Sequence, residues 1–190
     1  MSVFGIIVEG PRDAAVYPVV IRRIRPDVEE VLAEACGGRS NLGTHFVGWL
    51  KHFQYQRRMD KALIIRDADR KAPHLREAQL RDRLDESGFM PTFPVHFYAT
   101  KCMLDSWLLA DVGAICEVAR RRGRHKSLKE IKEPLEEITD PKTVFERMLS
   151  QAGLPADDRV CEEIAFAANL ERIALRCPYF RQFRKNVHAC

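Results

Sequence analysis

The sequence lacks three features that would assign it to common classes of protein. No apolar run approaches the roughly 18 residues of a membrane-spanning helix. The six cysteines include no Cys-x-x-Cys pair, which argues against a zinc site. The opening residues, MSVFGIIVEG, have no basic segment and lose their apolar character at Glu9, so we expect a strand there and not a signal peptide. Together these absences favour a cytoplasmic protein with reduced thiols and no membrane contact.

The composition describes an ordinary folded domain. The chain has 190 residues, of which 46% are hydrophobic and 31% charged. This length suits one domain, with or without an appendage, and supplies enough apolar side chains for a buried core. The net charge of +4 is compatible with binding to nucleic acid but does not require it.

The segment KALIIRDADR holds the most informative pattern. Its apolar run, residues 62–65, is typical of a buried strand and is followed by Asp67 and Asp69. Alternation in an extended chain points these two carboxylates to the same side, where they repel each other unless a cation lies between them. The pattern therefore predicts a site for a hard metal ion. An Asp-rich turn after a strand is the alternative interpretation.

A first strand, residues 3–8, ends in the same way. Glu9 follows it directly, and Pro11 then opens a helix that we expect over residues 11–24. In open α/β sheets, ligands bind at the edge where strands give way to helices. Asp13 lies near the start of the helix, where it could serve as a metal ligand or simply favour the helix dipole.

A later strand, residues 94–99, leads into a third acidic position. The following segment, residues 100–111, is predicted to be helical, with Asp105 early in the helix and Lys101 one turn before it. Both would lie near the sheet edge that carries Glu9. The alternatives are a first-turn carboxylate for Asp105 and a solvated lysine for Lys101.

The order of these segments predicts the fold class. Strands and helices alternate up to residue 111, with a weaker strand at 27–35, a helix at 42–58 whose aromatic stripe we assign to core packing, and a helix at 75–87. This order predicts an α/β, Rossmann-like parallel sheet of about four strands with helices on both faces. Residues 112–190 are predicted to form a helical extension packed on the 1–111 core, with helices at 112–122, 141–153, 159–175 and 178–186.

The acids at equivalent strand ends indicate a common chemistry. Clustered carboxylates destabilise a fold. A metal site is therefore favoured by the four acids expected at one sheet edge, which are Glu9, Asp67, Asp69 and Asp105. Oxygen ligands without His or Cys favour Mg²⁺ or Mn²⁺. Such a metal polarises a phosphoryl oxygen, Lys101 can stabilise the leaving oxygen, and Glu9 can hold a metal or act as a general base. This chemistry fits phosphodiester hydrolysis.

Basic residues supply candidate contacts with nucleic acid, and we expect DNA in preference to RNA as the partner. They gather beside the acids, at 120–126 and at 176–185. The alternatives are a solvated helix end for the second group and a packed C-terminal helix, anchored by Tyr179, Phe180 and Phe183, for the third. The candidate contacts are Arg66, Arg70, Lys71, Arg121, Arg122, Arg124, Lys126, Arg181 and Arg184.

Several motifs resemble the Toprim domain. The segment VEGPRDA, from Val8 to Ala14, resembles its first motif, and IIRDAD, from Ile64 to Asp69, resembles its DxD motif. The segment DSWLLAD, residues 105–111, and the stretch from Leu170 to Phe183, which contains CPYFR, look like those of a group of small stand-alone bacterial Toprim-like proteins. The resemblance covers nearly the whole chain.

The resemblance implies a metal site of Glu9, Asp67 and Asp69 with Asp13 as an added ligand, as in OLD-type nucleases. Two departures stand out: Asp105 replaces an expected Glu, which shortens its reach, and Tyr179 replaces the usual Ser. Members of the group are often encoded beside an AAA/ABC-type ATPase, and this resemblance suggests a two-part antiviral system. The sequence has no Walker A motif, so such an ATPase would be a separate chain.

Three hypotheses follow. The first is a Mg²⁺- or Mn²⁺-dependent Toprim nuclease acting in antiphage defence. The second is a non-catalytic Toprim-like scaffold that binds and regulates a partner ATPase. The third, a receiver-like phospho-acceptor domain, conflicts with the order of the acids, because receivers carry paired acids after the first strand and a single Asp after the third.

Overall fold

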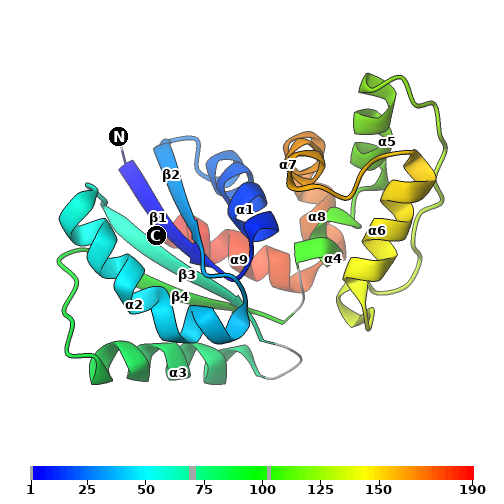
Figure 1. Cartoon of the computed structure of the whole chain (residues 1–190). Coiled ribbons are helices and arrows are strands. Elements are labelled where there is room, and N and C mark those ends of the chain that lie inside the picture. The colour runs from blue at the N-terminus through cyan, green and yellow to red at the C-terminus, as the bar shows by residue number, and fades with distance from the viewer. Residues whose placement is uncertain (1, 69–71, 102–103) are drawn as a thin grey trace. The chain divides into compact units, whose positions relative to one another are not determined.

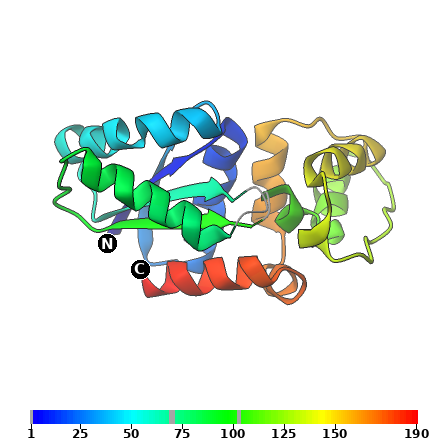
Figure 2. The ribbon, with the colours of Figure 1, turned by 90° about the horizontal axis from the view of Figure 1, so that it is seen from below.

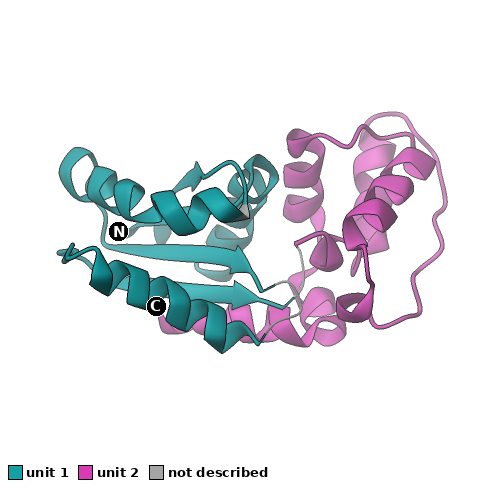
Figure 3. Cartoon of the chain, turned by 60° about the horizontal axis from the view of Figure 1, so that its bottom comes forward, with its two compact units in different colours: residues 1–101 teal, residues 102–190 magenta. Residues whose placement is uncertain are grey.

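The computed structural model describes residues 2–68, 72–101 and 104–190. Over these ranges the chain forms two compact units, residues 1–101 (unit 1) and residues 102–190 (unit 2), as coloured in Figure 3. The sequence places the boundary after residue 111. In the structure the short helix α4 (Leu104–Leu108) belongs instead to unit 2.

Unit 1 is built on a four-stranded sheet. Its strands are β1 (Ser2–Val8), β2 (Val28–Ala35), β3 (Lys61–Asp67) and β4 (Val95–Thr100), in the order β2-β1-β3-β4. Every neighbouring pair is parallel. The middle residues of the central strands β1 and β3 are apolar and buried, as expected of parallel strands covered on both faces. The predicted α/β class with a four-stranded parallel sheet is confirmed.

Helices cover both faces of this sheet, as predicted. Helix α1 (Pro11–Ile24) lies on one face, and α2 (Arg39–Gln56) and α3 (Pro73–Glu86) lie side by side on the other (Figures 1 and 2). Alternation along the strands divides their side chains between two cores. On the α2 and α3 side, one cluster joins Ile7, Ile64 and Phe97 of the sheet to Phe46, Leu50, Phe53, Leu80 and Leu84 of the helices.

The approach of α2 to β1 depends on a glycine. A Cβ atom added at Gly5 would lie 2.6 Å from Cε2 of Phe53, a ring that is itself 1% exposed. We expect Gly5→Ala to lower the free energy of unfolding by about 1–3 kcal/mol, because the ring cannot move without disturbing a packed core. Urea unfolding measures this change.

The control for this variant is Gly48→Ala. Gly48 lies within α2, and no atom lies within 4 Å of a Cβ built there. Alanine is the better helix former by about 1 kcal/mol, so this variant should be neutral or more stable. Equal losses of stability in the two variants would contradict the packing argument.

Every regular element in the described residues of unit 2 is a helix. Trp107 of α4 is 1% exposed, and its ring lies 5.0 Å from that of Phe180 and 5.2 Å from that of Phe183, measured between centroids. This aromatic cluster explains why α4 belongs with the helices that follow it in the chain. After α4 come α5 (Val112–Arg121), the 3₁₀ turn η1 (Leu135–Glu137), α6 (Pro141–Ala152), α7 (Asp158–Ala167), α8 (Leu170–Arg176) and α9 (Pro178–Ala189).

Two predicted helices are wrong in their extent. The helix predicted at 159–175 is interrupted, because the side chain of Asn169 caps α8 by accepting hydrogen bonds from the backbone N–H groups of Glu171 and Arg172. The helix predicted at 100–111 is helical only at Leu104–Leu108 within the described residues, since Thr100 is still part of β4.

Two predictions from composition concern membranes and cysteines. No helix in the described ranges is long and apolar enough to cross a membrane. Five cysteines lie in those ranges, and none of them forms a disulfide: Cys36, Cys116, Cys161, Cys177 and Cys190.

Candidate active site

The carboxyl ends of β1 and β3 form the candidate active site. The chain runs from β1 to its neighbour β2 on one side and then crosses to β3 on the other side of β1. The strand order therefore reverses between β1 and β3, and crevices at such a switch point are where open α/β sheets bind ligands. Glu9 directly follows β1, and Asp67 is the last residue of β3.

The parallel register brings these two acids into contact. Ile7 pairs with Ile64, so the residues that follow in each strand reach the sheet edge together. Oε1 of Glu9 accepts a hydrogen bond of 3.2 Å from the backbone N–H of Asp67, a residue 58 positions away. The structure thus joins one acid from each of the two motifs noted in the sequence.

Arg66 offsets part of the negative charge. Its Nε atom lies 3.8 Å from Oε1 of Glu9, and its side chain is only 9% exposed. Opposite charges at this distance attract, so the pair reduces the repulsion between Glu9 and the neighbouring acids. The contact of Arg66 with nucleic acid remains a prediction, and the structure places its guanidinium beside an acid of the site.

Asp13 is the third residue of α1 and lies in its first turn. Its Oδ2 atom accepts a hydrogen bond of 3.1 Å from the backbone N–H of Gly10, which precedes the helix. This contact is the local, helix-start role that the sequence left open. The bond also places the Asp13 carboxylate beside Gly10, which is the residue that follows Glu9.

Three carboxylates act electrostatically on one buried phenol. Tyr17 of α1 is 2% exposed. Burial raises the pKa of its hydroxyl well above the ordinary value, and the negative charges of Asp13, Asp67 and Glu9 raise this pKa further, while a hydrogen bond with Thr100 opposes the rise. The acids at positions 9, 13 and 67 therefore converge on one region of unit 1.

This region fits a divalent ion that keeps much of its water. Within the described ranges, no group of three or more His, Cys, Asp or Glu side chains is arranged to hold a metal ion. Mg²⁺, however, is usually held by one or two carboxylates together with waters and substrate phosphates, so Glu9 and Asp67 supply a suitable oxygen donor set. Asp69, Arg70 and Lys71, which the sequence analysis also assigned to the site, lie outside the described residues.

The remaining predicted catalytic and metal residues lie in different units. Lys101 follows β4 directly, is exposed and belongs to unit 1. Asp105 belongs to unit 2, where it is 4% exposed in the first turn of α4. Unit 1 therefore brings together Glu9, Asp13 and Asp67, and the roles of Lys101 and Asp105 remain predictions.

Most of the described basic candidates of unit 2 have partners within that unit. Arg122 pairs with Glu163, and Arg184 pairs with Glu171. Arg121 pairs with Glu117, and Nε of Arg181 donates a hydrogen bond to the carbonyl of Ala174. Hydrogen bonds from arginine are the foremost cause that lowers the pKa values of the three glutamates: from Arg120 and then Arg121 for Glu117, from Arg122 for Glu163 and from Arg184 for Glu171.

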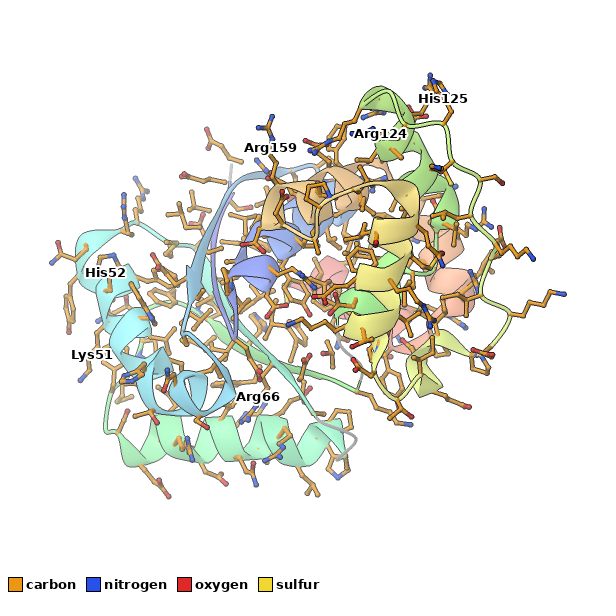
Figure 4. The ribbon with its side chains drawn as sticks, turned by 45° about the vertical axis from the view of Figure 1, so that its right-hand side comes forward. Lys51, His52, Arg66, Arg124, His125 and Arg159 are labelled. Carbon is orange, nitrogen blue, oxygen red and sulfur yellow. The ribbon has the colours of Figure 1, made fainter. Side chains whose placement is uncertain are left out.

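The segment after α5 differs from this pattern. Arg124 and Lys126 are exposed, and neither forms an ion pair within the residues that the structure describes. Figure 4 shows Arg124 and its neighbour His125 projecting at the end of α5. Among the basic candidates in unit 2, these two cations are the ones best able to reach a phosphate backbone without giving up an internal partner.

A hollow beside α2 has no signal in the sequence. It has a volume of about 480 Å³ and lies where β2 ends, next to the strand that carries Glu9. Burial is the main cause that raises the pKa of the Cys36 thiol to about 11, so this cysteine stays protonated and is a poor nucleophile. The lining residues are Ala35, Cys36, His45, Gly48, Trp49 and His52.

Sequence reasoning also missed Tyr17 and Thr100. In the sequence pattern, Tyr17 fits the apolar face of α1, and Thr100 looks like an ordinary residue at a strand end. The only signal in the sequence is their polarity at positions that the fold buries. Such groups need hydrogen-bond partners, and these partners become visible only once the fold is known.

Comparisons with known proteins find similar solved structures but no matching family. No family model matches the chain, and no curated protein matches it. The structure is similar to the C-terminal region of the Xanthomonas campestris pv. campestris OLD protein, with 16% identity, 98% of each chain covered and a TM-score of 0.49. It is also similar to the C-terminal region of the Burkholderia pseudomallei OLD protein, with 16% identity, 95% of this chain and 98% of that chain covered, and a TM-score of 0.47. At these values the similarity concerns the arrangement of the chain and supports no statement about chemistry.

Proposed function

We propose that the chain is a Toprim-type nuclease that hydrolyses phosphodiester bonds of nucleic acid with Mg²⁺ or Mn²⁺. One observation carries the proposal. Glu9 and Asp67, which belong to the two motifs that resemble Toprim, are joined by a hydrogen bond at the topological switch point of the sheet. A fold gains no stability from gathering acids at one edge, so their convergence favours a functional explanation.

Each residue then has a defined task. Glu9 and Asp67 would hold the cation, with Asp13, Asp69 and Asp105 as candidate further ligands. When bound, the cation would polarise a phosphoryl oxygen of the substrate. Arg66 offsets part of the charge of Glu9, and Lys101 would stabilise the leaving oxygen. Glu9 is also the candidate general base toward water.

The proposed substrate is nucleic acid, with DNA preferred to RNA. The exposed cations Arg124 and Lys126 support this choice, because contact with phosphates needs Lys and Arg that are not already paired. A role in antiphage defence beside a separate AAA/ABC-type ATPase belongs to the same proposal. It follows from the resemblance of the motifs and from the lack of a Walker A motif in this chain.

A specific observation favours a second candidate function. Within the described part of the chain, no three acidic, His or Cys side chains are arranged to hold a metal. A non-catalytic scaffold that regulates a partner ATPase would need no such arrangement. The two candidates differ in one measurable property, which is hydrolysis by the isolated chain.

The experiment that tests the proposal is a cleavage assay with the purified wild-type chain. The substrates are supercoiled plasmid and a structured RNA, each with Mg²⁺, Mn²⁺ or EDTA. We expect the plasmid to be nicked or degraded with either metal and to stay intact in EDTA. Intact substrates under all conditions would favour the scaffold, and cleavage that persists in EDTA would contradict a metal-dependent reaction.

A further inference from the structure

Three polar side chains from three different elements meet behind the candidate active site. Tyr17 lies in the second turn of α1, Thr100 is the last residue of β4, and Asp67 is the last residue of β3. Asp67 and Thr100 are direct partners in the parallel register of β3 and β4. Tyr17 is 2% exposed and Thr100 is 4% exposed, so water has little access to either hydroxyl.

The Thr100 hydroxyl links the other two side chains. Oγ1 of Thr100 donates to Oδ1 of Asp67 over 3.1 Å, and the carbonyl of Arg66, at 3.4 Å, is a longer alternative. A charged acceptor makes the stronger bond, so the single hydroxyl proton of Thr100 belongs to Asp67. Tyr17 and Thr100 are also hydrogen-bonded to each other. Tyr17, Thr100 and Asp67 thus form one hydrogen-bonded group with the Thr100 hydroxyl between the other two side chains.

The hydroxyl groups of Tyr17 and Thr100 add little to the stability of the core. A buried hydroxyl gains little stability over an apolar group of the same shape, because it exchanges bonds with water for bonds within the protein. Phenylalanine at position 17 and valine at position 100 would pack in the same space. The Thr100 hydroxyl does, however, hold one oxygen of the Asp67 carboxylate at a fixed place, and the Tyr17 hydroxyl in turn contacts that of Thr100.

We infer that Tyr17 and Thr100 are positioning residues that orient the Asp67 carboxylate for a divalent cation. The inference rests on the proposed function, since Asp67 is a proposed ligand there. Partners behind a metal ligand fix its rotamer, and losing them typically costs about 10–100-fold in metal affinity or activity. Neither hydroxyl touches the substrate in this scheme.

The test measures Mn²⁺ binding to the full chain by titration calorimetry, without any substrate. We expect Thr100→Val to weaken Mn²⁺ binding by about 10–100-fold and Tyr17→Phe to weaken it by up to about tenfold, since the phenol acts one bond further away. Thr100→Ser keeps the hydroxyl and should bind within about threefold of the wild type. The double variant should be no weaker than Thr100→Val alone, because both changes act through the same carboxylate.

The matched control is Tyr98→Phe. Tyr98 is another buried tyrosine, 9% exposed, on the same strand as Thr100. Its loss of a hydroxyl should leave Mn²⁺ affinity unchanged. Unfolding in urea is measured for every variant. If Thr100→Val does not fold, the comparison of Tyr17→Phe with Tyr98→Phe still decides.

The outcomes separate this inference from the proposed function. If the wild type binds Mn²⁺, Asp67→Asn abolishes binding, and Thr100→Val and Tyr17→Phe bind as the wild type does, the positioning role is overturned and the metal site stands. If the wild type neither binds Mn²⁺ nor cleaves, the proposed function fails and the positioning role fails with it. Weaker binding in both variants with rescue by Thr100→Ser supports the inference.

Discussion

An Asp67→Asn variant is expected to lose metal-dependent cleavage by about 10³-fold or more. The change removes one negative charge but keeps the size of the side chain and an oxygen that can accept the hydrogen bond from Thr100. A bound cation supplies several kcal/mol of charge stabilisation in the transition state, and each 1.36 kcal/mol changes the rate tenfold. Initial rates of plasmid nicking in Mg²⁺ and Mn²⁺ measure the effect.

The control for this variant lies at the other end of the same strand. Asp60 directly precedes β3, and its Oδ2 atom accepts a hydrogen bond of 2.7 Å from the backbone N–H of Val3. Asp60→Asn makes the same chemical change away from the candidate site, so its cleavage rate should match the wild type. If Asp67→Asn cleaves as fast as Asp60→Asn does, Asp67 is not a ligand in the reaction.

The stability of Asp67→Asn provides a second readout. Asp67 lies near Glu9 and Asp13, and the three like charges repel one another in a half-buried region. We expect the free energy of unfolding to be unchanged or raised in this variant. A loss of activity with no loss of stability is the signature of a residue kept for function.

The second large effect concerns the core of unit 2. Trp107→Ala is expected to lower the free energy of unfolding of this unit by about 3–5 kcal/mol, because it leaves a cavity where the indole packs between Phe180 and Phe183. Urea unfolding followed by far-UV circular dichroism measures the loss, since this unit is built of helices in its described residues.

The chain offers a matched control for this variant in its other tryptophan. Trp49 of α2 is only half-buried, and its ring meets His52 edge to face with centroids 5.6 Å apart. Truncation there removes less buried surface and should cost clearly less stability. An equal cost for Trp49→Ala and Trp107→Ala would mean that the aromatic cluster does not carry the stability of unit 2.

The local features of the fold could be predicted from the sequence. Apolar runs ending in acids gave β1 and β3 and placed Glu9 and Asp67 at one sheet edge. The break before α8 was missed although Asn169 is a strong N-cap residue, because the apolar pattern continues on both sides of it. In this case a local cap overrode the periodicity.

Long-range pairing could not be predicted in the same way. Arg121 and Glu117 are four positions apart in α5, a spacing that allows an ion pair to be foreseen. Arg122 and Glu163 are 41 positions apart, and nothing in either neighbourhood indicates their contact. Thr100 and Asp67 lie even further from Tyr17 in the sequence, so the hydrogen bonds behind Asp67 emerge only from the register of the strands.

That register has a consequence for insertions and deletions. Successive side chains of β3 point to opposite faces, so Asp67 meets Thr100 on the α1 side while Ile64 belongs to the core under α2 and α3. Inserting one uncharged residue into β3 would leave the residues of every motif and the net charge unchanged. It would nevertheless exchange the two faces of the strand and separate Asp67 from Thr100. The site therefore depends on the number of residues in the strand as much as on the identity of its acids. Among homologous chains, length changes should gather in the loops and avoid Lys61–Asp67.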